Sequence, residues 1–278
     1  MSHRLKSWLL AALTLATGSV LADQERPLWE LGLGVAAVSF PSYRGSDQTN
    51  NFMMPVPLVT YHGDFFKADR HGIRGSFFDS DFVDLTVSLA LSPPASSDEI
   101  IARKNMPDLE GSFEIGPQVD LTFWRSENRA RFFKLLMPLR VAMTVESSPQ
   151  NLGWVFHPKL NLDITDIPNL PGWNLGLLAG PVIGNQRQNA YYYSVAQEYA
   201  TPDRPAYEAS GGYAGMQYTM GFSKRFPKFW VGTFLRYDNL SGARFEDSPL
   251  VKQKDYFAAG VAVTWVLGES ATRVMVND

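Results

Sequence analysis

The sequence predicts an all-β fold: a transmembrane antiparallel β-barrel of twelve strands, with short turns at one end and longer loops at the other. Three observations predict it: an N-terminal secretory signal, long runs in which apolar and polar residues alternate, and connections that are short and long in turn. A ten-stranded barrel is the alternative count. The soluble alternative is a secreted β-sandwich or lipocalin-like barrel, which would show shorter strands and a charged face toward water.

The N-terminal segment has the pattern of a secretory signal peptide. Arg4 and Lys6 supply its positive start, and the apolar stretch "WLLAALTLATGSV" follows, with Asp23 as the expected mature start. The apolar stretch is too short to span about 30 Å of hydrocarbon. We therefore expect a cleaved signal peptide, an outer-membrane β-barrel and a periplasmic C-terminal tail, over 1–22, 23–267 and 268–278 respectively.

Net charge and cysteine content argue against nucleic-acid binding and exclude disulfide bonds. The formal net charge of the whole chain is −3, and removing the signal, which holds two basic and no acidic residues, makes it −5. An acidic chain gives no reason to expect nucleic acid as a partner. The chain has no cysteine, so its stability comes from packing or backbone closure and not from disulfides.

Period-two alternation marks strands with two different faces. The runs begin near Trp29, Asp84, Phe113, Phe133 and Leu152 and last about 10–15 residues, whereas soluble strands usually have about 5–6. A tilted transmembrane strand needs about 9–11 residues. Length and alternation together favour a barrel with apolar residues toward lipid and polar residues toward the lumen. In the run from Leu152, the apolar face is expected to comprise Leu152, Trp154, Phe156, Leu160, Leu162 and Ile164.

Connection lengths give the orientation and the strand count. Outer-membrane barrels have short periplasmic turns and longer external loops. The short connections are 62–64, 79–81, 126–130, 167–171 and 226–228, and the long ones are 41–50, 93–109, 185–211 and 241–254. Each set falls on one side if 65–78 forms a hairpin of two short strands turning near Arg70–Gly72, which gives twelve strands. Leaving that hairpin out of the wall gives ten.

A set of polar residues is expected to face the lumen. These residues are Glu114, Gln118, Asp120, Lys134, Arg140, Glu146, His157, Lys159 and Asp163. Charges of both signs can pair across neighbouring strands and plug the barrel, because a buried charge is costly unless it is paired. They can also line a pore. The mixed signs and the limited strand number favour a closed or nearly closed barrel, with a diffusion pore as the alternative.

No enzyme signature is present, so no catalytic, cofactor-binding or metal-ligating residue is assigned. The glycines of "GLGVAA" from Gly32 lie within a strand and open no helix, which excludes a dinucleotide fingerprint. His62, Asp64, Asp69 and His71 lie close in sequence, but polar turn residues explain them better than a metal site does.

The stretch "NAYYYSVAQEYATPDRPAYEASGGY", from Asn189 to Tyr213, holds six of the eleven tyrosines. It joins the strand near Trp173–Gly184 to the strand near Gly212–Arg225, so it falls on the external side. Tyrosine favours membrane–water boundaries, where its ring is buried and its hydroxyl is wet. We expect an interfacial girdle together with loop packing. The extracellular loop residues singled out are Tyr191, Tyr192, Tyr193, Tyr199, Arg204 and Tyr207.

Three stretches resemble the MltA-interacting protein family, also called MipA/OmpV, and the resemblance covers essentially the whole mature chain. They are "PSYRGSDQTNNFMMPVPLVTYHGDFF" (41–66), the tyrosine loop continued to 215, and the closing "YFAAGVAVTWVL" (256–267). Members of the family typically close on an aromatic residue near the C-terminus. Here Trp265 is followed by "VLGESATRVMVND", so the barrel-closing strand, with Gly260 and Trp265, would be internal.

The resemblance implies an outer-membrane protein of the Gram-negative cell envelope, surrounded by outer-membrane lipid. It implies a non-enzymatic scaffold that links a lytic transglycosylase to a penicillin-binding murein synthase in peptidoglycan metabolism. The alternative is a small-solute pore, or an envelope-stress or adhesion barrel that acts through its extracellular loops. The family has no established catalytic residues to carry over.

Overall fold

The computed structural model describes residues 24–62, 66–69, 72–75, 78–80 and 82–276, with the backbone alone for 24, 62, 66–69, 72–75, 78–79 and 275–276. The fold is all-β with one short α-helix, which confirms the predicted class. The strands are β1 Gln24–Pro27, β2 Trp29–Pro41, β3 Thr49–His62, β4 Phe66–Asp69, β5 Gly72–Gly75, β6 Phe78–Asp79, β7 Val83–Ser92, β8 Ser112–Arg125, β9 Arg131–Thr144, β10 Asn151–Phe156, β11 Lys159–Ile164, β12 Trp173–Gly184, β13 Gly212–Arg225, β14 Phe229–Asn239, β15 Asp255–Glu269 and β16 Arg273–Val276. The helices are α1 Gln186–Tyr193 and the 3-10 turns η1 Ser97–Glu99, η2 Ile101–Arg103 and η3 Gln197–Tyr199.

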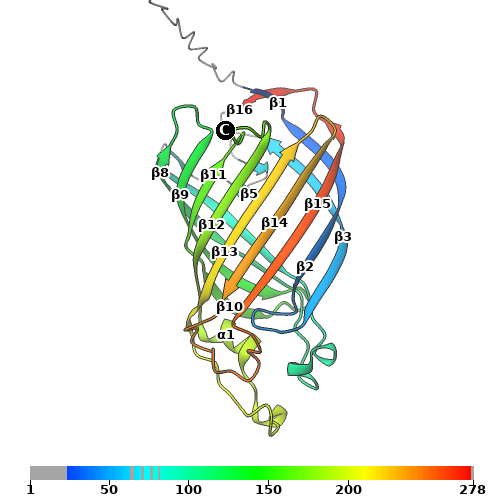
Figure 1. The fold of residues 1–278 in the computed structure, drawn as a ribbon, viewed down its shortest axis with the longest axis vertical. Helices are drawn as coiled ribbons and strands as arrows, with labels where there is room; N and C mark the ends of the chain where they lie inside the picture. Colours follow the sequence, from blue (N-terminus) through cyan, green and yellow to red (C-terminus); the bar gives the residue numbers. More distant parts are fainter. Residues whose placement is uncertain (1–23, 63–65, 70–71, 76–77, 81, 277–278) are drawn as a thin grey trace, which may run out of the picture.

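The long strands form one antiparallel sheet of fourteen strands that curls round on itself (Figure 1). Its hydrogen-bonded order is β5-β4-β3-β2-β15-β14-β13-β12-β10-β9-β8-β7-β6, and β11 pairs with β9 and β12. The late strand β15 therefore lies beside the early strand β2, where Ala262 is opposite Ala36. The hairpin expected within 65–78 is present as β4 and β5.

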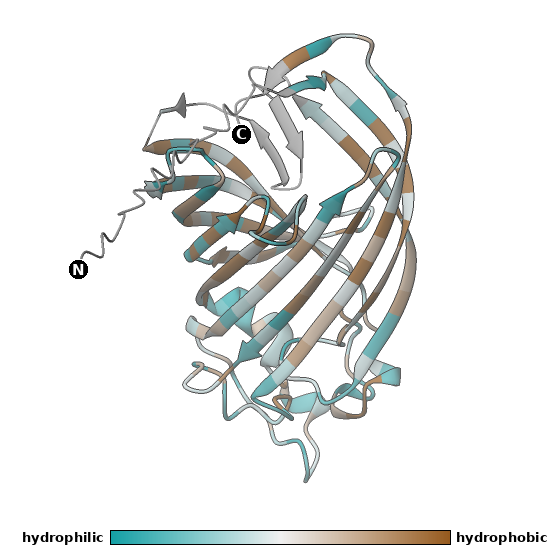
Figure 2. Cartoon of the chain, turned by 45° about the horizontal axis from the view of Figure 1, so that its top comes forward, coloured by the Kyte–Doolittle hydropathy of each residue, from teal (hydrophilic) through white to brown (hydrophobic). Residues whose placement is uncertain are grey.

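Alternation along each strand separates an outward from an inward face, as β2 illustrates. Leu31, Leu33 and Val35 are 48%, 51% and 47% exposed, whereas Gly34 and Ala36, on the opposite face of the strand, are buried. This is the reverse of a soluble sheet protein, because the large apolar side chains point outward. Figure 2 shows brown apolar segments alternating with paler ones along the strands.

Two details of the run from Leu152 differ from its sequence pattern. The register with β9 shifts between Asn151 and Gly153, so Leu152 is an extra, bulged residue and is buried, while Trp154 is exposed. A bulge changes which side a residue faces, and simple alternation therefore misplaced Leu152. The run is also divided into β10 and β11 at Pro158, which has no backbone N–H for the ladder.

The connections gather at two ends of the sheet. The long ones between β2 and β3, β7 and β8, β12 and β13, and β14 and β15 lie at the end that carries α1, which we call the loop end (Figure 1). The tight turns after β8, β11 and β13 lie at the opposite end, the turn end, together with β1 and β16. The separation of short from long connections agrees with the sequence-based expectation.

Candidate functional site: the loop cap, the inward face and the terminal ribbon

The long loops pack together into what we call the loop cap, residues 41–48, 93–110, 185–211 and 240–254. Tyr193 lies at its centre, 4% exposed, with its ring stacked on Phe245 at a centroid distance of 3.6 Å. The Tyr193 hydroxyl donates to the Arg44 carbonyl at 2.9 Å, and the Ser248 hydroxyl donates to the Tyr193 carbonyl at 2.7 Å. Leu240 and Leu250, fully buried, belong to the same cluster. Three loops thus meet on one tyrosine.

Helix α1 is the part of the tyrosine loop that sequence reasoning missed. Asn185 caps its N-terminus by accepting from the Gln188 N–H at 3.1 Å, and the same oxygen accepts from Trp154 N–H at 3.1 Å. Gly153 beside it has φ +115°, and an added Cβ would lie 2.1 Å from the Asn185 side-chain oxygen. The β10 bulge and the helix cap therefore fix each other. The cap residue directly after a strand was the available sequence signal.

The other loop residues singled out by the sequence mostly hold the cap together. The Tyr191 hydroxyl accepts from the Glu110 N–H at 2.7 Å. Burial raises the pKa of Tyr191 to about 12 and also raises the pKa of Tyr192. Tyr199 and Tyr207 are partly buried against the same cluster. Loop packing rather than a membrane girdle therefore accounts for these four tyrosines and for Tyr193.

Arginines join the loops through backbone carbonyls. Arg204 donates to the carbonyls of Tyr199, Ala102 and Lys104 at 2.8–3.1 Å. Arg103, which the sequence did not single out, donates to the Tyr192 carbonyl at 3.0 Å, and burial lowers its pKa. Each guanidinium supplies several fixed donors, which suits it to satisfying carbonyls of two loops at once.

The inward face of the sheet carries ion pairs among the residues expected to line the lumen. Arg140 pairs with Glu114 at 2.8 Å, and its guanidinium also donates to the Ser88 hydroxyl at 3.2 Å. Lys134 pairs with Asp84 at 3.6 Å. These contacts join β7, β8 and β9 across the inward face.

The remaining members of that set lie in different surroundings. Gln118 donates to Asp120 at 2.7 Å, and Asp163 accepts from Asn161 at 2.6 Å. His157 is buried, and Lys159 is partly exposed. Glu146 lies beyond the end of β9, is exposed, and accepts from the Thr144 hydroxyl at 2.9 Å, so it does not sit among the others.

A second group on the inward face was not found from the sequence. Asp238 is 0% exposed and accepts from Arg44 and Gln217, both at 3.1 Å. The Arg236 Nε lies 2.8 Å from the other Asp238 oxygen, but its N–H does not point along that line, so this contact is an ion pair and not a hydrogen bond. Alternation along β14 could have placed Arg236 and Asp238 inside; Arg44 lies in a loop and no pattern indicates it.

The outward face carries aromatic residues at both ends of its strands. On β14 and β15, Tyr237 and Phe257 lie side by side near the loop end, and Phe229 is opposite Trp265 near the turn end. Trp173 stacks on Phe222 at 4.4 Å, also toward the turn end. Aliphatic residues fill the space between, and roughly 26 Å of strand separates the two aromatic ends.

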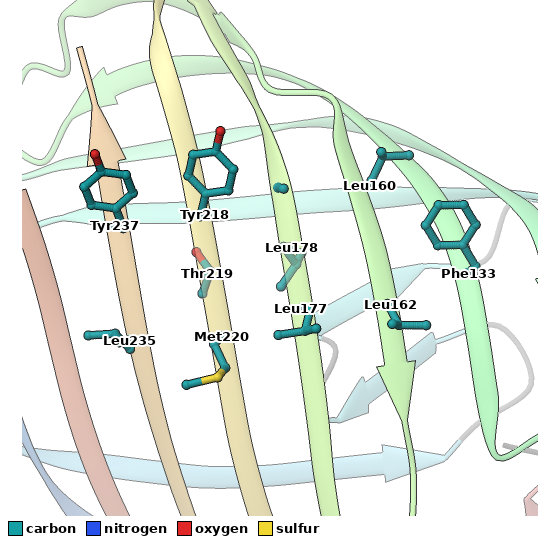
Figure 3. Close-up of a pocket in the computed structure, with 11 residues that line it drawn as sticks. Phe133, Leu160, Leu162, Leu177, Leu178, Tyr218, Thr219, Met220, Leu235 and Tyr237 are labelled. Carbon is teal, nitrogen blue, oxygen red and sulfur yellow. The ribbon is translucent and has the colours of Figure 1, made fainter. Parts of the chain in front are cut away.

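An apolar groove of about 410 Å³ runs along this outward face across β9 and β11–β14 (Figure 3). It is hollowed at Ala179, which is opposite Leu160 on one side and Tyr218 on the other. Leu177, Met220 and Leu235 form the row beside it.

The two ends of the described chain pair with each other at the turn end. β1 and β16 form a separate two-stranded sheet with Gln24 opposite Val276 and Pro27 opposite Arg273. The Leu28 N–H donates to the Thr272 carbonyl and the Ser270 N–H to the Trp29 carbonyl, both at 2.9 Å. These bonds make β1 and β16 a continuation of the β2–β15 pair. We call residues 24–28 and 270–276 the terminal ribbon.

The described residues show neither a cluster of metal-ligating side chains nor a membrane-spanning helix. The side chains of His62, Asp64, Asp69 and His71 lie outside the described residues. Within the part that the structure describes, no three acidic, histidine or cysteine side chains are grouped as a metal site. No described helix is long and apolar enough to cross a membrane.

Comparison with known proteins gives the family. The sequence model of the MltA-interacting protein MipA family matches residues 33–267, from within β2 to near the end of β15. The chain belongs to the MipA family. The match covers the inward ion pairs and the loop cap. No relative was found among the curated proteins.

Two solved structures are similar to this MipA-family chain in outline. One is described as a bacterial polysaccharide outer membrane secretin, with 9% identity, 86% of this chain and 99% of that chain covered, and a TM-score of 0.41. The other is the toluene transporter TodX of Pseudomonas putida, with 10% identity, 87% and 68% covered, and a TM-score of 0.25.

Proposed function

We propose that this chain is a non-enzymatic outer-membrane β-barrel that holds a lytic transglycosylase at its periplasmic end. The outward face is the observation that carries the membrane part of the proposal. Large apolar side chains there are exposed on strand after strand, with aromatic residues at both strand ends. Monomeric soluble proteins rarely expose apolar surface of this extent, and a band of lipid-facing residues between aromatic girdles is the pattern of membrane barrels.

The wall is proposed to be a closed barrel of twelve strands. β10 and β11 are two halves of one strand, and β6 has two residues, so the fourteen strands in the described sheet reduce to twelve. The β15–β2 ladder closes one seam, and β5 lies next to β7 at the other. Closure is favourable because it removes exposed strand edges, which cannot be satisfied in lipid.

The turn end is proposed to face the periplasm and the loop end the outside. Membrane barrels of this type have short periplasmic turns and longer external loops. The terminal ribbon then lies in the periplasm, where murein enzymes work. The family is named for its interaction with MltA, and we carry that partner class, a lytic transglycosylase with a penicillin-binding murein synthase beside it, to this chain.

The terminal ribbon is the proposed docking element. The turns after β8, β11 and β13 are short, and a stable interface usually buries about 1,200–2,000 Å² in total. The ribbon projects from the turn end, and within the described residues each of its strands pairs on one side only. An unpaired strand edge can accept an extended segment of a partner through backbone hydrogen bonds.

Capture of a lytic transglycosylase from detergent extracts tests the docking role. Deleting 273–278 removes β16 and should abolish capture, whereas Val274→Thr keeps the backbone donors and should leave capture unchanged. Both proteins should show heat-modifiable migration on a gel, which reports an intact barrel. Undiminished capture by the deletion variant would rule out the ribbon as the docking element, and failure of the unaltered chain to capture the enzyme would rule out the scaffold role.

A small-solute pore is the second candidate. Gly221 on β13 lies on the inward face, and no atom lies within 4 Å of a Cβ added there, so the interior has open space at that level. A pore needs a path for solutes through the loop cap, whereas a scaffold does not. Whether the cap is closed therefore distinguishes the two candidate functions.

A further inference from the structure

Five basic side chains lie on the inward face beneath the loop cap: Arg44, Arg140, His157, Lys159 and Arg236. We call them the cationic layer. Lys159 lies beside Gly180, Gly180 is opposite Gln217, and Gln217 is opposite Asp238, so Lys159 and Asp238 lie on one hydrogen-bonded row across β11 to β14. Arg44 reaches this level from the loop after β2 and contacts Asp238. The charges of Lys159, Arg140, Arg44 and Arg236 all act on the His157 ring.

Among the described residues, positive charge exceeds negative charge in this layer. Asp238 is shared by two guanidiniums, those of Arg44 and Arg236. Glu114 is paired with Arg140. Lys159 has no ion-pair partner within 4 Å among the described residues, although the charges of Asp120 and Glu114 act on it. Among the residues that the structure describes, four cations, Arg44, Arg140, Lys159 and Arg236, therefore face three carboxylates, Asp238, Glu114 and Asp120.

The layer is also short of hydrogen-bond partners. His157 is 5% exposed, and its Nε2 has no hydrogen-bond partner. The Arg44 Nη2 is also without one. Buried polar groups are usually hydrogen-bonded, and an exception calls for an explanation such as an absent ion.

The layer borders solvent-accessible space on the inward face. The side chains of Arg236 and Arg44 are 31% and 23% exposed although they lie inside the sheet. The open position at Gly221 lies on the same inward face, further toward the turn end. Above the layer, Tyr193 packs on Arg44 through its hydrogen bond and belongs to the buried core of the loop cap.

We propose that the cationic layer is a binding site for a small oxyanion of the phosphate class, which enters from the turn end. Lys159 and the guanidinium groups of Arg236 and Arg44 would donate charge-assisted hydrogen bonds to its oxygens, which are the strong kind. The anion would offset the excess positive charge. This inference rests on the closed wall of the proposed function but not on the docking of a murein enzyme.

Calorimetric titration of the full chain in detergent with inorganic phosphate tests the site. The unaltered chain should bind phosphate saturably. Lys159→Gln and Arg236→Gln should each raise the dissociation constant about tenfold or more, because each removes a charged donor. Lys134→Gln is the matched control: it removes a lysine from the same face, near the turn end, and should leave binding unchanged.

Each outcome decides the proposal. Heat-modifiable migration is checked for every variant, and Arg236→Gln keeps the test valid if Lys159→Gln fails to fold. No saturable binding by the unaltered chain overturns the site. An equal loss in Lys134→Gln also overturns it, because that result would show general charge attraction and not a located site. Capture of a murein enzyme is a separate measurement and does not affect this one.

Discussion

At the scale of single residues, the ion pair between Arg140 and Glu114 illustrates how charges are held on the inward face. Their side chains are 8% and 15% exposed and lie 2.8 Å apart, and the same guanidinium reaches Ser88 on a third strand. Removing one partner of a buried pair leaves an unpaired charge, whereas removing both costs far less. Breaking the Arg140–Glu114 pair therefore costs more stability than the attraction between the two charges contributes, because it leaves a buried charge unpaired.

We expect Arg140→Met to lower the free energy of unfolding by about 3–5 kcal/mol, because Glu114 would remain buried without its partner. The double variant Arg140→Met with Glu114→Gln should recover much of that loss. Urea unfolding of the protein in detergent gives both values. Equal destabilisation in the single and double variants would show that packing, not charge, is responsible.

The buried phenols of the loop cap predict a response to alkaline pH. Burial raises the pKa of Tyr191 to about 12, and it also raises the pKa of Tyr43 and Tyr193. A raised pKa means that the folded state favours the neutral phenol, so this stabilisation is complete below the ordinary value of about 10 and is lost as the pH rises through the folded value.

Ultraviolet titration of tyrosinate measures that response. A group of tyrosines in the folded chain should ionise later than in the unfolded chain, and Tyr191→Phe should remove one late-ionising group. The cap should loosen above about pH 10. Identical titration curves for the folded and unfolded chains would contradict the packing of these rings.

At the scale of elements, the loop cap is a small core built from connections. Loops are normally variable and mobile, but these four share a buried cluster that includes Tyr193, Leu240 and Phe245. The Arg204 guanidinium joins the far part of the tyrosine loop to the loop after β7. Without Arg204, the Ala102 and Lys104 carbonyls would lose these hydrogen-bond donors.

We therefore expect Arg204→Ala to release the two loops from each other. Limited proteolysis should cut within 93–110 or 196–208 several times faster, because charged hydrogen bonds each contribute about 1.5–3 kcal/mol. Arg187→Ala is the control, since Arg187 is exposed on α1 and its side chain makes no hydrogen bond or ion pair with the residues that the structure describes. Unchanged cleavage in Arg204→Ala would show that the hydrophobic cluster alone holds the cap.

At the scale of the molecule, the two ends of the curled sheet differ. The loop end is covered by a packed cap, and the turn end carries tight turns and the terminal ribbon (Figure 1). The proposed barrel is therefore a cup, covered at the loop end, and not an open channel. That shape favours the scaffold over the diffusion pore, and it also defines the cationic layer as the floor of the cup.

Planar-bilayer recordings test whether the loop cap closes the proposed barrel to ions. The unaltered chain should show no steady conductance, and the double variant Tyr193→Ala with Phe245→Ala, which empties the centre of the cap, should conduct. Arg187→Ala should behave like the unaltered chain. Steady conductance of the unaltered chain that changes in Arg140→Ala or Glu114→Ala would instead establish the pore.

The sequence by itself determined the all-β class, the strand ranges near Trp173–Gly184 and Gly212–Arg225, the short hairpin at β4 and β5, and the family. These features depend on local alternation and on connection length, and both can be read along the chain. The same rule failed at Leu152, because one bulged residue reverses the facing of its neighbours without changing the pattern of letters.

Only the tertiary structure decided where the tyrosines and the arginines lie. Tyr193 could have been a girdle residue, and it is buried because Phe245 and Ser248, some fifty residues further along the chain, come back to meet it. Arg44 lies in a loop that no periodicity marks, yet it reaches Asp238 on β14. Contacts between residues so distant in sequence depend on how the sheet curls and which loops it brings to one end, and no local pattern carries that information.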